Sequence, residues 1–211
     1  PNSGIESVRE LQKRMQDYGI GKIASISGRY FAMDRNDNWD RIEKAYNTMT
    51  EGKGNQITDP LTYLKESYSK NIYDEFIEPA VIMEDGKPVA LIQNNDSVVF
   101  FNFREDRARQ ITKAFVLPGF VKFKREQLKN IDFVTMVQYE EGLPVNVAFK
   151  PIGVEEPLGK VLSDNKIRQL RIAETEKFAH VTYFFNGGLE EVFPYEDRVI
   201  VPSLNVESFA D

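Results

Sequence analysis

The chain has 211 residues, of which 41% are apolar and 28% are charged, a balance typical of a folded globular protein and not of a disordered one. Its 27 basic and 33 acidic residues give a net charge of −6, which argues against nucleic-acid or membrane-surface partners and requires any anion site to be local. Cysteine is absent and the single histidine is His180, which excludes disulfides, cysteine nucleophiles and metal sites that need two histidines.

The ends and the hydropathy of the chain set its expected context. No apolar run approaches the roughly 20 residues that a membrane-spanning helix needs, and the first ten residues lack a secretory signal pattern. We therefore expect a cytoplasmic protein. We also expect a monomer, although the residues themselves do not set the oligomeric state. The chain begins at Pro1 instead of Met, and a helical pattern starts almost at once, so we expect a fragment of a longer protein.

Helical and strand patterns alternate along the first 140 residues. Ser3 and Glu6 match a capping box at a helix start, and Val98 to Phe103 are mostly apolar on consecutive positions, which predicts an inner strand buried on both faces. The order predicts an α/β domain, a mixed sheet flanked by helices. The expected elements are helix 3–19, strand 22–27, helix 39–50, a helix from Asp59-Pro60, a hairpin of strands 80–83 and 89–93, strand 96–103, helix 105–115 and strand 131–139.

The pattern lapses between residues 142 and 157, where three prolines occur and no period persists. We place a linker at residues 151–156, directly after Lys150. It separates a domain of residues 1–150 from a second segment of residues 157–211. The second segment is short for an independent α/β domain, which predicts missing neighbours. Its expected elements are helix 158–162, strand 169–172, helix 177–185 and strand 198–201.

Four arginines stand in two short motifs. Arg29 and Arg35 lie in GRYFAMDR, and Arg104 and Arg107 lie in FFNFREDRAR, each motif after a β-type run. Guanidinium groups fit carboxylate and phosphate oxygens two at a time, so the clustering predicts a small polyanion ligand. Both pairs could point into one cleft at the carboxyl ends of the strands, the usual crevice of open α/β sheets. The alternative is surface salt bridging, because acids stand beside these arginines.

Four motifs follow one another along the chain: GRYFAMDR, FFNFREDRARQ, FVTM and AETEKFAHVTYFFNGG. In this order they resemble the cofactor-independent (2,3-bisphosphoglycerate-independent) phosphoglycerate mutases over the whole chain. Small departures occur at Asn36 and Asn38, where that family usually has an acidic and a basic residue.

The resemblance implies a two-domain enzyme that interconverts 2- and 3-phosphoglycerate through a phosphoserine intermediate. A phosphatase-like domain carries the serine and two divalent metals, usually manganese, and an inserted phosphotransferase domain holds the glycerate. This chain then resembles a truncated phosphotransferase domain, residues 1–150, followed by part of the alkaline-phosphatase-like α/β domain, residues 157–211. The nucleophile segment and the metal ligands are missing from it, so we expect the isolated chain to be inactive.

The resemblance also assigns roles to residues. It implies that Arg29, Arg35, Arg104 and Arg107 bind the substrate, and that Lys177 reaches the phosphoryl group from the phosphatase-like side. The alternative for Lys177 is a surface lysine paired to Glu174 or Glu176.

Several neighbouring residues receive structural interpretations. His180 and Arg109 are interpreted as structural side chains, and Trp39 and Tyr46 as core. Asp34 and Asp106 could orient the arginines but are interpreted as solvated turn acids.

Two other functions stay open. A non-catalytic phosphate- or carboxylate-binding module would use the same arginines, and a related metal-dependent sugar-phosphate mutase shares the two-domain scheme, although GRYFAMDR argues against it.

Overall fold

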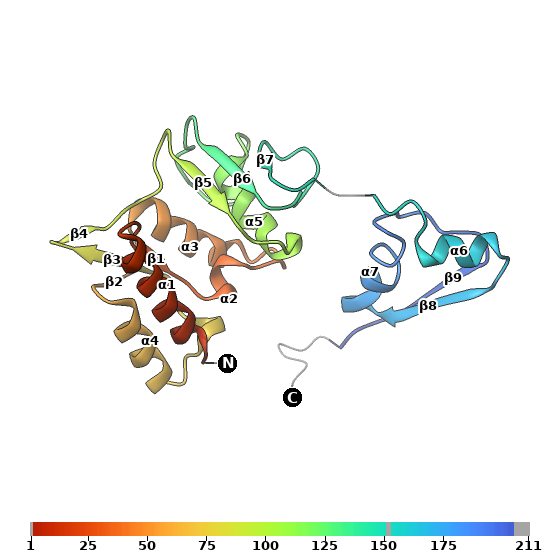
Figure 1. Cartoon of the computed structure of the whole chain (residues 1–211), viewed down its shortest axis with the longest axis horizontal. Coiled ribbons are helices and arrows are strands. Elements are labelled where there is room, and N and C mark those ends of the chain that lie inside the picture. Colours follow the sequence, from red (N-terminus) through yellow and green to blue (C-terminus); the bar gives the residue numbers. More distant parts are fainter. Residues whose placement is uncertain (1, 151–152, 205–211) are drawn as a thin grey trace. The chain divides into compact units, whose positions relative to one another are not determined.

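A computed structural model describes residues 2–150 and 153–204, and the chain forms two compact units, Pro1–Lys150 and Pro151–Asp211 (Figure 1). Both units combine helices and strands, which confirms the predicted α/β class. The first two residues of the predicted linker 151–156 lie outside the described residues. In the described part of the chain, no helix is both long enough and apolar enough to cross a membrane.

The first sheet of the amino-terminal unit is organised by one buried strand. Ala80, Val81 and Ile82 are each at most 6% exposed, and their strand pairs antiparallel with one neighbour and parallel with another. Two helices, α1 and α4, pack beside each other in this part of the unit (Figure 1). The elements are α1 (Gly4–Tyr18), β1 (Ser25–Ile26), β2 (Asn55–Ile57), α4 (Pro60–Ser69), η1 (Asp74–Phe76), β3 (Ala80–Glu84) and β4 (Lys87–Pro88), in sheet order β1-β3-β2 with β4 on β3.

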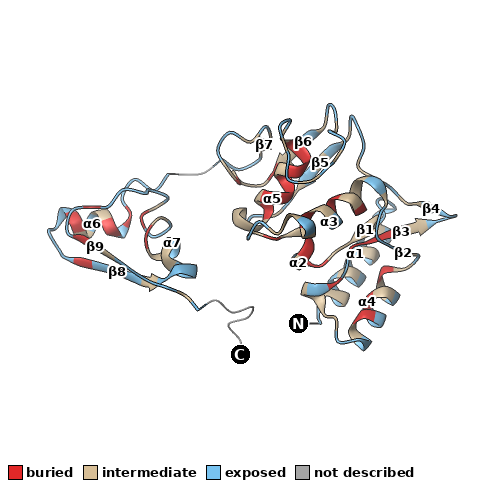
Figure 2. Ribbon diagram, turned by 180° about the vertical axis from the view of Figure 1, so that it is seen from behind, coloured by how far each residue is buried: buried red, intermediate tan, exposed pale blue. Residues whose placement is uncertain are grey.

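The second sheet of this unit is parallel, and its helices carry most of the core. Tyr46, Phe115 and Phe133 belong to one cluster of buried side chains, and burial is concentrated on α2, α3 and α5 (Figure 2). Burying such aromatic side chains is the main favourable term for this part of the fold. The elements are α2 (Arg29–Ala32), α3 (Trp39–Glu51), β5 (Ser97–Phe100), α5 (Glu105–Val116), β6 (Asp132–Thr135) and β7 (Asn146–Val147), in sheet order β5-β6-β7.

Three local predictions in this unit are wrong. The Ser3 side chain makes no cap hydrogen bond; instead the Asp74 carboxylate, 70 residues away, accepts from the Gly4 backbone N–H at 2.9 Å. The second hairpin strand is Lys87–Pro88, not 89–93. The strand over 96–103 is not buried on both faces: among the described strands it pairs only with β6, and Phe101 is 79% exposed.

The carboxy-terminal unit is a pair of parallel strands whose faces differ. Along β8 the buried side chains of Gln169 and Arg171 alternate with Leu170 and Ile172, which are more than half exposed. The buried face of β8 contacts α6, where the Gln169 side-chain amide donates to the Gly159 carbonyl at 2.9 Å. The elements are α6 (Leu158–Asp164), β8 (Gln169–Glu174), η2 (Thr175–Lys177), α7 (Phe178–Val181) and β9 (Glu196–Val201).

The predicted helix over 177–185 is shorter than expected. It forms as a turn of 3₁₀ helix followed by the four residues of α7, and the backbone leaves the helical region at Thr182, whose hydroxyl donates back to the Phe178 carbonyl at 2.8 Å. A threonine hydroxyl that bonds to the preceding turn is a common feature of helix ends.

A glycine allows two distant segments to touch just before α2. The Gly28 N–H donates to the Ile77 carbonyl at 2.7 Å, and a Cβ on Gly28 would lie 2.3 Å from the Glu75 carbonyl oxygen. No heavy-atom contact of that length is tolerated, so this close approach requires glycine.

We predict that Gly28→Ala lowers the free energy of unfolding by about 1–3 kcal/mol, because the backbone must shift to admit the methyl group. Chemical denaturation measures the change. Gly119→Ala is the matched control, since a Cβ there meets no heavy atom within 4 Å. Equal stability of the two variants would show that the contact between Gly28 and Glu75 is not tight.

Candidate functional site: an arginine cluster around Asp106

The four arginines lie at the start of α2, in the loop that follows it and at the start of α5. Arg29 is the first residue of α2, and Arg35 lies in the loop that follows this helix. Arg104 is the N-cap residue of α5, and Arg107 lies in its first turn. The sequence placed Arg29 and Arg35 across a loop at a strand end; the structure inserts a helical turn after Arg29.

Asp106 joins arginines from both motifs. Its Oδ2 accepts from Arg35 Nη1 at 2.8 Å and from Arg104 Nη2 at 2.9 Å, and its Oδ1 accepts from Arg104 Nε at 2.6 Å. The Arg107 backbone N–H also donates to Oδ1 at 2.9 Å. Partial burial raises the pKa of Asp106, but hydrogen bonds from Arg104 and Arg35 outweigh it and hold that pKa well below its usual range.

Arg107 is partly buried, and the positive charges of its neighbours oppose its own. Burial lowers the pKa of Arg107, and the positive charges of Arg35, Arg29 and Arg104 lower it further. Its Nη1 donates to the Met33 carbonyl at 3.1 Å. Its Nε is buried and has no hydrogen-bond partner among the described residues. A buried donor without a partner is costly, so this atom favours a ligand that accepts from it.

Arg29 completes the group from the side of η1. Its Nη2 donates to Glu75 Oε2 at 2.9 Å, and its side chain stays half exposed. Its charge is close enough to act on Arg107. The cluster thus contains six charged side chains, the four arginines together with Asp106 and Glu75. Four guanidinium groups and two carboxylates give these six a net charge of +2.

Asp34 fixes the loop that carries Arg35. It is 4% exposed, and its carboxylate accepts from the backbone N–H groups of Asn36 and Asn38 at 3.0 and 2.9 Å. In the orientation that gives both ends of the buried Gln110 amide a hydrogen-bond partner, its nitrogen donates to Asp34 Oδ2 at 3.0 Å and its oxygen accepts from the Asp37 N–H at 2.9 Å. The interpretation of Asp34 as a solvated turn acid is therefore wrong, because its oxygens are the acceptors for the loop backbone. Asp106 is not a simple turn acid either, since it pairs with two arginines.

Lys177 lies in the other unit, at the end of η2, and is exposed. The role of Lys177 stays a prediction, and the alternative of a surface lysine paired to Glu174 or Glu176 stays open. His180 is exposed too, and its ring packs against Phe184 with centroids 5.4 Å apart.

The neighbouring candidates have structural partners. Arg109 Nε donates to the Tyr139 carbonyl at 2.8 Å and lies 3.5 Å from Glu140 Oε2. Tyr46 is 1% exposed in the core, and Trp39 packs against the same cluster. These contacts confirm the structural interpretations of Arg109, Trp39 and Tyr46.

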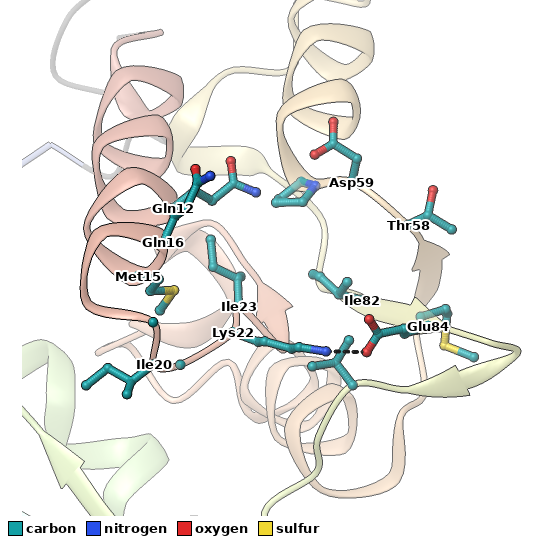
Figure 3. Close-up of a pocket in the computed structure, with 15 residues that line it drawn as sticks. Gln12, Met15, Gln16, Ile20, Lys22, Ile23, Thr58, Asp59, Ile82 and Glu84 are labelled. Atoms are coloured by element: carbon teal, nitrogen blue, oxygen red, sulfur yellow. Dashed lines mark hydrogen bonds and ion pairs between the residues drawn. The ribbon is translucent and has the colours of Figure 1, made fainter.

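A separate hollow of about 420 Å³ lies between α1, the start of α4 and β3 (Figure 3). Its charged groups already have partners: Lys22 Nζ pairs with Glu84 Oε2 at 2.5 Å, and Asp59 caps α4 by accepting from the Thr62 N–H. Lys22, Asp59 and Glu84 sum to a charge of −1, so no positive charge is in excess in this hollow, in contrast to the arginine cluster.

The described residues do not provide a metal centre: no three His, Cys, Asp or Glu side chains among them are grouped to hold an ion. The carboxylates of the cluster, Asp106 and Glu75, face guanidinium groups and are unsuitable as cation ligands. The donor set present here thus fits an anion.

Comparison with known proteins gives the same family as the sequence motifs. The family model described as "BPG-independent PGAM N-terminus" matches residues 1–141. The chain belongs to the cofactor-independent phosphoglycerate mutase family. Proteins named 2,3-bisphosphoglycerate-independent phosphoglycerate mutase are 53% identical in Clostridium novyi (strain NT), 48% in Moorella thermoacetica and 46% in Listeria monocytogenes, each over 99% of this chain.

A solved structure of a phosphoglycerate mutase has a similar fold. A phosphoglycerate mutase of Leishmania mexicana, crystallised at low cobalt concentration, superposes with a TM-score of 0.77 and 27% sequence identity over 97% of this chain. The chain spans 41% of the length of the three mutase sequences and 40% of the Leishmania chain.

Sequence reasoning missed one acid of the cluster, Glu75, and misinterpreted another, Asp34. Glu75 is 46 residues from Arg29, and no motif or period marks it as the partner of that arginine. Asp34 was named as able to orient the arginines, but its burial was not expected; its carboxylate accepts the backbone N–H of Asn36, two residues on, as in an Asx-turn.

We predict that Asp34→Ala lowers the free energy of unfolding by about 3 kcal/mol, because it leaves loop N–H groups without acceptors in a buried place. Thermal or chemical unfolding measures the loss. Asp17→Ala, an exposed acid near the end of α1, should change stability by no more than about 0.5 kcal/mol. If Asp34→Ala is as stable as this control, Asp34 does not organise the loop.

Proposed function

We propose that this chain supplies the substrate-gripping part of a phosphoglycerate mutase that interconverts 2- and 3-phosphoglycerate. The observation that carries the proposal is the convergence of arginines from two motifs on Asp106 in a member of the mutase family. Membership of the family supplies the reaction, and the cluster supplies a place for its anionic substrate.

The cluster suits a phosphoglycerate in charge and in donors. Near neutral pH such a molecule carries about three negative charges, on a phosphate and a carboxylate a few ångströms apart. Two positive charges in excess attract it, and planar guanidinium groups bind both ends through paired hydrogen bonds. Fixing both ends leaves the hydroxyl groups free to exchange a phosphoryl group in a defined orientation.

The two units divide the work in this proposal. Residues 1–150 act as the phosphotransferase domain, and residues 157–211 act as a partial phosphatase-like domain that brings Lys177 to the phosphoryl group. A lysine ammonium there would offset the negative charge of the phosphoryl oxygens during transfer. The serine nucleophile and the two divalent metals, for which manganese is the expected ion, are assigned to no residue of this chain. A cytoplasmic location and a monomeric state stay predictions.

We predict that Arg104→Ala lowers kcat/KM of the complete gene product about ten- to hundredfold, because it removes charge-assisted hydrogen bonds worth roughly 1.5–3 kcal/mol. A coupled assay of 3-phosphoglycerate conversion measures the change. Arg9→Ala is the control, since Arg9 is an arginine of similar exposure that pairs with an acid on α1. An unchanged kcat/KM in Arg104→Ala would refute a substrate role for the cluster. If the wild-type gene product itself shows no turnover, a non-catalytic binding module would be favoured.

For Lys177 we predict a different kinetic effect. Lys177→Ala should lower kcat more than it raises KM, because the ammonium acts on the phosphoryl group in transfer more than on ground-state binding. Steady-state kinetics of the complete gene product separates the two constants, and Lys166→Ala, another exposed lysine of the same unit, is the control. A normal kcat in the Lys177 variant would remove this residue from the mechanism.

A further inference from the structure

Asp106 is the one carboxylate that contacts arginines from both motifs within the described residues. We propose that Asp106 is a positioning residue, which holds Arg35 and Arg104 as a preformed pair for the two-ended anion. This inference rests on the proposed function, because it assigns a role within the same site.

The two guanidinium groups need such a bridge. Arg35 stands on the loop after α2 and Arg104 at the start of α5, so they come from different elements. Their like charges repel, and Arg104 is 56% exposed, so nothing in its packing alone fixes the head group. A carboxylate between them offsets the repulsion and sets both the distance and the plane of each group.

Asp106 is itself held in place. Its Oδ1 accepts the Arg107 backbone N–H at 2.9 Å in the first turn of α5, where the helix dipole favours a negative charge. The carboxylate is therefore tied to the helix, and the arginines that it holds are tied to the helix through it.

The geometry also leaves Arg104 able to bind a ligand. Asp106 uses the Nε and Nη2 side of this guanidinium, so the Nη1 amino group is not engaged by Asp106. A guanidinium has five N–H donors, and a partner on one side of the fork orients the donors on the other.

Positioning and simple electrostatics predict opposite signs for a neutral variant. A carboxylate inside an anion site repels the incoming anion, so removal of its charge alone would tighten binding. If Asp106 acts by holding the arginines, its removal loosens them and weakens binding despite the gain in net positive charge. The sign of the change in affinity therefore decides between the two.

The test is calorimetric titration of the complete gene product with 3-phosphoglycerate and, separately, with inorganic phosphate. We expect Asp106→Asn to weaken 3-phosphoglycerate binding about tenfold, and phosphate binding less, because only the two-ended ligand needs both arginines at a fixed separation. Equal or tighter binding of 3-phosphoglycerate would overturn the inference, as would an equal loss for both ligands.

Two further variants keep the result interpretable. Glu140→Gln removes a carboxylate that pairs with Arg109 and Lys113 outside the cluster, and it should leave both affinities unchanged. If Asp106→Asn does not fold, Asp106→Glu preserves the charge but displaces it by one methylene; weaker 3-phosphoglycerate binding supports positioning, and unchanged binding refutes it.

Arg104→Ala separates this inference from the proposed function. If Arg104→Ala binds 3-phosphoglycerate as well as the wild type does, the proposed function fails and the inference fails with it. If Arg104→Ala weakens binding while Asp106→Asn does not, the proposed function stands and only the role of Asp106 is refuted.

Discussion

The arginine cluster depends on one constraint: like charges stay together in a folded protein only where other groups offset their repulsion. Two unit charges about 4 Å apart near a protein surface repel by roughly 4 kcal/mol. Here the carboxylates of Asp106 and Glu75 and the carbonyl of Met33 supply the compensation. They offset only part of the charge of the four guanidinium groups, and in the proposed function the remainder attracts the anionic substrate.

The fold serves this constraint by bringing distant segments to one place. Gly28 lets the segment before α2 approach Glu75 and Ile77, and this contact brings Arg29 and Glu75 together. Asp34 ties the next loop to its own backbone and, through Gln110, to α5. The loop after α2 and the middle of α5 are thereby connected by partly buried polar contacts, which favour one arrangement because each unpaired group would be costly.

Much of this was predictable from local patterns. The local sequence pattern predicted α1, α3 and α5. Asp59-Pro60 predicted the start of α4, where the Asp59 side chain caps the helix by accepting from the Thr62 N–H. The two arginine motifs predicted that Arg35 and Arg104 lie close together, and both contact Asp106; that they form an anion site stays a prediction. These features depend on neighbours within a few residues of one another.

What the sequence could not predict depends on contacts between distant residues. The cap of α1 comes from Asp74, and the exposure of β5 depends on which strands flank it. The same run of apolar residues fits an inner strand or an edge strand, and only the sheet order decides. Likewise, Asp106 could be recognised as a bridge only when the loop that carries Arg35 was placed beside α5.

The most direct test of the account is a crystal structure of the complete gene product with 3-phosphoglycerate bound. We expect oxygens of the ligand within hydrogen-bond distance of Arg104 and of Arg107 Nε, with Asp106 still bridging Arg35 and Arg104. A ligand bound elsewhere, with these guanidinium groups in contact with protein atoms alone, would contradict it.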